Sequence, residues 1–79
     1  MVKLGQPVVV VWEDAWQTEG YATPEELSQA TAKVLQSQGF LVRSDKTAIC
    51  IGMDQLPDGR YRDIKYIPRQ IVVKVRRLK

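Results

Sequence analysis

The sequence contains no histidine, and Cys50 is its only cysteine among 79 residues. Imidazole most often performs acid–base catalysis near neutral pH, and zinc sites are usually built from histidine or several cysteines. We therefore expect no metal site, no cofactor and no Ser-His or Cys-His nucleophile. Carboxylate catalysis remains open in principle, but Glu13, Asp14 and Glu19 match no spacing of a catalytic pair. We expect a protein that is not an enzyme and has no catalytic residues.

Long apolar segments are also missing. The longest purely apolar run covers residues 8–12, whereas a membrane-spanning helix needs about 20 residues. No secretory segment follows Met1, and a single cysteine cannot form an internal disulfide. These absences predict a cytoplasmic protein without a membrane partner. A short chain of ordinary globular composition also predicts a single domain over residues 1–79.

Acidic residues become scarce toward the end of the sequence. The last twenty residues hold eight basic side chains and one acid, Asp63, while everything before them holds four basic and eight acidic side chains. The formal charge of +3 therefore divides into about −4 followed by about +7. This separation points to an anionic partner, provided that folding collects the basic side chains on one surface.

Alternating apolar and polar residues predict five short strands. Apolar, β-branched residues fill the first strand, and a period of two follows in the others. The predicted strands cover residues 7–12, 40–43, 47–53, 61–67 and 71–76. In the third strand Ile49, Ile51 and Met53 would share one face, with small residues on the other.

Residues 24–37 carry the signals of a helix. Thr23 is suited to cap its start, Pro24 fits the first helical position, and Glu26 completes a capping box. Apolar residues follow at helical spacing, and Gly39 is placed to end the helix in a left-handed conformation. The pattern predicts one helix between the first two strands.

Five strands with one inserted helix, over about residues 24–37, predict an α+β, mainly β fold. The close spacing of the strands after the helix favours a small five-stranded barrel or a strongly bent antiparallel sheet. An open sheet with the helix on one face is the alternative. We expect a break at residues 68–70, because proline cannot donate a ladder hydrogen bond.

Three segments resemble a known group of proteins. They are Trp-Glu-Asp-Ala at residues 12–15, the run from Gly-Phe-Leu-Val at 39–42 to Ile-Cys-Ile at 49–51, and Ile-Pro-Arg-Gln-Ile at 67–71. This arrangement resembles small proteins encoded by bacteriophages and prophages that look like SH3-type barrels. The resemblance implies a viral protein in the cytoplasm of a bacterial host, a brief helical turn at 68–70, and a helix that is an insertion.

Eight residues are candidates for ligand binding. Guanidinium groups offer planar, bidentate donors to phosphates and carboxylates, and aromatic rings stack on bases. The candidates are Arg60, Arg62, Lys65, Tyr66, Arg69, Lys74, Arg76 and Trp16. The alternative interpretations are structural: charges that protect a sheet edge, a frayed basic tail, and a tryptophan that plugs a barrel.

The charge separation supports three functional hypotheses. The first is a non-catalytic protein that captures a small anionic ligand, with a pocket built between subunits of a homo-oligomer. If the phage resemblance holds, the ligand would be a nucleotide-derived immune signal of the host, and the protein an anti-defence sponge. The second hypothesis is nucleic-acid binding by the basic face, and the third is docking on a host or virion protein.

Overall fold

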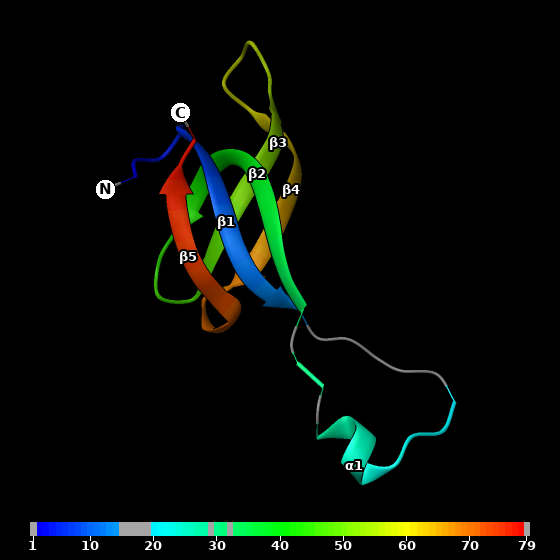
Figure 1. Cartoon of the computed structure of the whole chain (residues 1–79). Coiled ribbons are helices and arrows are strands. Elements are labelled where there is room, and N and C mark those ends of the chain that lie inside the picture. Colours follow the sequence, from blue (N-terminus) through cyan, green and yellow to red (C-terminus); the bar gives the residue numbers. More distant parts are fainter. Residues whose placement is uncertain (1, 15–19, 29, 32, 79) are drawn as a thin grey trace.

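One five-stranded antiparallel sheet dominates the computed structural model, which describes residues 2–14, 20–28, 30–31 and 33–78 (Figure 1). The strands are β1 (Pro7–Asp14), β2 (Lys33–Ser44), β3 (Ala48–Gln55), β4 (Tyr61–Pro68) and β5 (Val72–Arg77). Their order across the sheet is β4-β3-β2-β1-β5, so β4 and β5 are the edges. The five predicted strands are confirmed, and the predicted break is a 3-10 turn, η1 (Arg69–Ile71).

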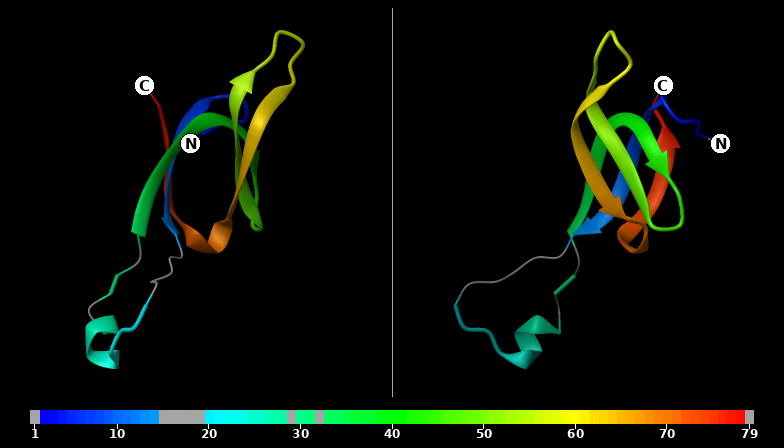
Figure 2. Two further views of the ribbon diagram at one scale, coloured as in Figure 1. Left: turned by 90° about the vertical axis from the view of Figure 1, so that its right-hand side faces the viewer. Right: turned by 180° about the vertical axis from the view of Figure 1, so that it is seen from behind.

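The sheet is open and strongly bent. The strand order joins neither β4 to β5 nor any other pair that would close it, so the bent sheet is the predicted form that the structure shows. Figure 2 shows how far it curls: β3 and β4 face β1 and β5 across the concave side, and η1 bridges the two edges. This curvature brings the end of β2 near β5, and the pocket described below lies between them.

The core fills the concave side of the sheet. Its members come from four strands, and each is at most 2% exposed: Val8, Val10, Leu41, Ile49, Ile51 and Ile67. They follow the period of two that a strand imposes on side chains. The shared face of Ile49 and Ile51 is therefore confirmed, although Met53 at the end of that row is exposed.

The helix prediction is wrong over most of its length. The helix α1 (Pro24–Leu27) has four residues, and its predicted N-cap is confirmed, since Thr23 Oγ1 accepts a hydrogen bond of 3.1 Å from the Glu26 amide. Residues 33–37 belong instead to β2, where they pair with residues 10–14 of β1.

The pairing with β1 explains this correction. A helix over residues 24–37 would need an apolar surface to pack on, because isolated helices of that length are marginal in water. Val34, on its predicted apolar face, is 59% exposed in the structure. As a strand the same segment gains a ladder along β1, and Ser37 Oγ accepts a hydrogen bond of 2.9 Å from the Trp12 indole.

Gly39 lies inside β2 and does not end a helix. A Cβ atom at this position would stand 2.8 Å from the Gly52 carbonyl oxygen and 3.1 Å from Ile51 Cβ. The first distance is shorter than real Cβ atoms show, and a backbone oxygen of the neighbouring strand cannot easily move away. Glycine is therefore required here by the close approach of β2 and β3.

The segment that contains α1 projects from the end of the sheet formed by β1 and β2 (Figures 1 and 2). Every residue from 20 to 28 is exposed, and α1 has no buried residue. Within the described part of the chain, no helix is long and apolar enough to cross a membrane.

The substitution Gly39→Ala should reduce the free energy of unfolding by about 1–3 kcal/mol, the usual effect of overpacking a tight contact. Urea denaturation followed by circular dichroism measures the change. The exposed, β-branched substitution Val34→Thr in the same strand is the control and should stay within about 0.5 kcal/mol of the wild type. Equal stability of the two variants would contradict the close approach.

Candidate anion-binding site

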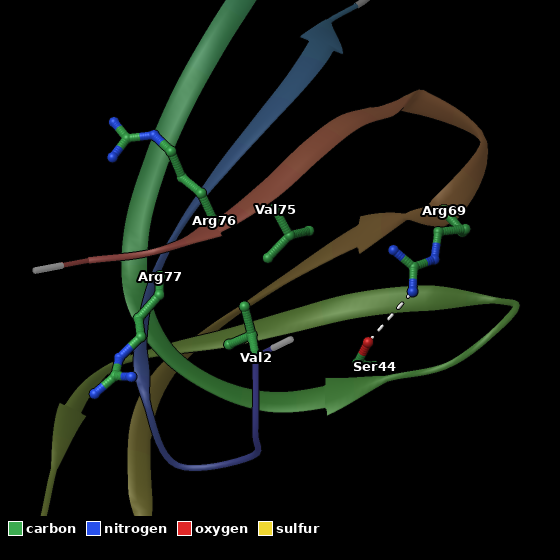
Figure 3. Close-up of a pocket in the computed structure, with 6 residues that line it drawn as sticks. All are labelled: Val2, Ser44, Arg69, Val75, Arg76 and Arg77. Carbon is green, nitrogen blue, oxygen red and sulfur yellow. Dashed lines mark hydrogen bonds between the residues drawn. The ribbon is translucent and has the colours of Figure 1, made fainter.

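A cavity of about 500 Å³ lies between β5, the end of β2 and η1. Its lining combines three arginines, two valines and one serine: Arg69, Arg76, Arg77, Val2, Val75 and Ser44. Figure 3 shows Val2 and Val75 in the middle, with Arg69 and Ser44 at one end and the other two arginines at the opposite end. No acidic side chain is among the lining residues that the structure describes. The pocket is a cationic concavity with an apolar floor.

The strand β5 supplies half of this pocket. Its pairing with β1 places Val75 opposite Val10 of the core and Arg77 opposite Val8. Arg76 and Arg77 are consecutive, so their side chains leave opposite faces of the sheet. Both line the pocket at the β5 edge of the sheet, and Figure 3 shows their guanidinium groups directed away from Val2 and Val75.

Arg69 is held in place by the β2–β3 turn. Its Nε donates to the Asp45 carbonyl oxygen at 3.1 Å, and its Nη2 donates to Ser44 Oγ at 3.3 Å. Its backbone amide also donates to the Thr47 carbonyl oxygen at 2.9 Å. These bonds join η1 to the turn and orient the guanidinium group before any ligand arrives. An oriented guanidinium loses less side-chain freedom on binding an anion than a free one.

Asp45 fixes the turn that holds Arg69. Its carboxylate accepts hydrogen bonds from the backbone amides of Thr47 and Ala48, at 2.8 and 2.9 Å, and from Arg43 Nε at 2.6 Å. The Arg43 hydrogen bond, followed by the two amides, lowers the pKa of Asp45 to about 2. Since these donors occupy the carboxylate, only the carbonyl group of Asp45 contacts Arg69.

Two of the predicted binding residues are paired elsewhere. Arg60 forms an ion pair of 2.7 Å with Asp58, and Arg62 forms one of 3.1 Å with Asp54. All four lie on the β3–β4 hairpin, whose tip projects away from the rest of the sheet (Figure 1). The expectation that the basic residues of the last two strands form one patch is therefore wrong for Arg60 and Arg62.

Lys65 lies over an aromatic ring on the concave side. Its Nζ is 5.2 Å from the centroid of the Trp12 ring and 3.3 Å from Ser37 Oγ. The same hydroxyl accepts the Trp12 indole hydrogen bond. Lys65 thus links β4 to β1 and β2 across the bend of the sheet, and it does not line the pocket.

The remaining candidates are also separate from the pocket. Tyr66 pairs with Cys50 on the convex side, where the Arg43 guanidinium carbon lies 5.7 Å from its ring centroid. Lys74 is exposed on β5, opposite Val11. Trp16 falls outside the described residues. Of the seven predicted residues that the structure describes, Arg69 and Arg76 are the two that line the pocket.

Four pocket residues were missed by the sequence analysis: Arg77, Val2, Ser44 and Val75. Arg77 is adjacent to the predicted residue Arg76. The alternation of side chains along a strand assigns the two to opposite faces, so it did not predict that both would line one pocket. Val2 precedes the first strand, and no pattern in the sequence places it. The curvature of the sheet, which sequence alone does not give, brings these residues together.

Comparison with protein families, curated proteins and solved structures finds no match to this chain. The resemblance to phage proteins of the SH3 type therefore remains a prediction. Among the described residues, no group of three acidic or cysteine side chains is arranged to hold a metal ion.

Acid should weaken the turn that orients Arg69. The pKa of Asp45 is about 2 in the folded protein and 3.8 as its ordinary value, so its contribution to stability is complete above pH 3.8. That contribution should be lost as the pH falls through about 2. Thermal unfolding measured across this interval should show a smaller decline for Asp45→Asn than for the wild type.

The substitution Asp63→Asn is the matched control for this titration. The Asp63 carboxylate makes no hydrogen bond or ion pair within the described chain, and asparagine tolerates the positive φ of 58° at this position. The control should keep the pH dependence of the wild type. An unchanged decline in Asp45→Asn would show that the Arg43 contact does not stabilise the turn.

Proposed function

We propose that this protein is a non-catalytic binding protein that takes a small anionic ligand between β5, η1 and the end of β2. One observation carries the proposal: Arg69, Arg76 and Arg77 all line one cavity whose described lining contains no acid. Grouping three cations without a counter-charge costs folding energy, and a bound anion would offset that cost.

The lining suggests which anions fit. Guanidinium groups form charge-assisted, often bidentate hydrogen bonds with phosphates and carboxylates. Val2 and Val75 offer an apolar surface between the two ends of the pocket. A ligand with an anionic group on a planar or apolar body, such as a nucleotide, would use both kinds of surface. The volume of about 500 Å³ lies within the usual range for small-molecule sites, roughly 300–1,000 Å³.

The distribution of charge favours a small ligand over nucleic acid. A nucleic-acid backbone requires a row of cations that each release counterions from successive phosphates. Here Arg60 and Arg62 are paired with acids, and Lys65 lies against Trp12. Arg69, Arg76 and Arg77, which form no ion pair with any described residue, instead line one cavity. Nucleic-acid binding stays the alternative, and a steep loss of affinity for single-stranded DNA with salt would support it.

The sequence resemblance suggests a more specific form of this proposal. A phage protein with such a pocket would sequester a nucleotide-derived immune signal in the cytoplasm of its bacterial host. Sequestration needs affinity without turnover, and a chain that has no histidine fits that requirement. Docking on a host or virion protein is the third hypothesis from the sequence. The pocket favours ligand capture over it.

Titration calorimetry with ADP, ADP-ribose and cyclic dinucleotides tests the proposal directly. Arg69→Gln, Arg76→Gln and Arg77→Gln should each weaken binding by roughly 10- to 100-fold, because each removes a charge-assisted contact. Native mass spectrometry before and after heating would show whether a captured ligand leaves the protein unchanged.

Arg60→Gln and Arg62→Gln are matched controls, since each removes one arginine that is paired outside the pocket. They should alter affinity by no more than about twofold if surface pairs contribute little. Failure of every phosphorylated compound to bind the wild type would refute the proposal, as would equal losses in the control and pocket variants.

A further inference from the structure

The outer edge of the sheet at β5 is unoccupied in the single chain. β5 pairs with β1 on one side only, and the register between them shifts so that Val11 pairs with Lys74 and Trp12 with Val72. Val73, between these two positions, stands opposite no residue of β1 and is 54% exposed. β5 therefore presents an apolar side chain next to two exposed cations, Lys74 and Arg76.

Neither cation has an ion-pair partner in the part of the chain that the structure describes. Among the described residues, no carboxylate lies within ion-pair distance of Lys74 or Arg76, whereas Arg43, Arg60 and Arg62 all have such partners. Like charges would also oppose pairing of two β5 strands with each other. The chemistry of this edge suits an acidic segment that carries an apolar residue.

The chain itself contains such a segment. Residues 20–28, here called the arm, are exposed throughout and project from the sheet (Figures 1 and 2). Glu25 and Glu26 lie beside Leu27, which is 50% exposed, and Tyr21 is fully exposed. No cation of the described chain forms an ion pair with either glutamate.

The helix of the arm buries none of its side chains. It has four residues and is held by the Thr23 N-cap and local hydrogen bonds. One helical turn is far below the length at which a helix is stable in water, about 12–15 residues. A surface that covers Leu27 and Tyr21 would stabilise the arm.

We propose that the arm of one copy docks on the β5 edge of a second copy, with Glu25 and Glu26 meeting Lys74 and Leu27 meeting Val73. The arm points away from its own β5 in every view, which favours a second copy over its own chain. Each copy has one arm and one β5 edge, so two copies can exchange arms reciprocally. Such a contact closes as a two-fold dimer in which both β5 edges are covered, and β4 remains the other edge of each sheet.

This dimer does not depend on the proposed ligand. The docking residues Val73 and Lys74 do not line the pocket, and Arg69 lies on η1. A failure of dimerisation therefore leaves anion binding to be judged by its own titrations. Arg76 lines the pocket and takes no part in the substitutions used to test the dimer.

Analytical ultracentrifugation over a series of protein concentrations and two salt concentrations is the test. The wild type should form dimers whose dissociation constant rises with salt, as expected for contacts between exposed charges. Lys74→Glu and the double substitution Glu25→Lys/Glu26→Lys should each weaken the dimer at least about tenfold, because like charges then face each other. Combining the two sets should restore dimerisation, since the charges are exchanged.

Lys46→Glu is the matched control, because Lys46 is an exposed residue of the β2–β3 turn and its substitution changes the net charge equally. The variant should dimerise as the wild type does. Leu27→Ser should weaken the dimer without lowering the unfolding temperature of the monomer, since Leu27 is not part of the core. A wild type that stays monomeric, or equal effects of Lys74→Glu and Lys46→Glu, would overturn the proposal.

Discussion

The pairing of β1 with both β2 and β5 is the interaction on which the rest of the structure depends. Residues Val8, Val9, Val10 and Val11 are all buried, so β1 has an apolar side chain against each face of the sheet. All eight residues of β1 pair with β2, and five pair with β5. A strand with apolar side chains buried on both faces contributes strongly to the hydrophobic stabilisation of so small a chain, and β3, with residues 48–52 buried, does the same. Segments that pair with β1 therefore become strands even where their local sequence favours another structure.

Residues 33–37, which were predicted to be helical, show how pairing with β1 limits prediction from sequence. The N-cap at Thr23 is a local signal, and the structure forms its hydrogen bond to the Glu26 amide. The extent of the helix was inferred from spacing and from Gly39, and these signals depend on what the segment packs against. The strands around Ile51 and Ile67 were predictable because their period of two matches a buried face directly. Gly39 was predicted to end a helix in a left-handed conformation, and that prediction is wrong, because glycine is required there by the close approach of Gly52 on the next strand.

The basic residues of the last two strands illustrate why a site is harder to predict than a strand. Formal charge counts Arg62, Lys65 and Arg76 alike, yet the first pairs with Asp54, the second lies on Trp12 and the third lines the pocket. Alternation could assign each residue to a face of its strand. The bend of the sheet decides which ends of strands meet, and that bend arises from packing among distant segments. The charge pattern therefore predicted a cationic site, but of the described lining residues it identified two, Arg69 and Arg76.

The two edge strands, β4 and β5, differ in the features that protect them from pairing with another chain. This difference bears on both proposals. β4 contains Asp63 with a φ of 58° and ends at Pro68, features that interrupt a regular ladder and discourage pairing with another chain. β5 has no such interruption after Val73 and relies on Lys74 and Arg76 for protection. Protection by charge is selective: it repels a second basic strand but attracts an acidic segment or an anion. An edge guarded in this way remains available for binding, so the proposed ligand site and the proposed arm contact would both use the open edge at β5.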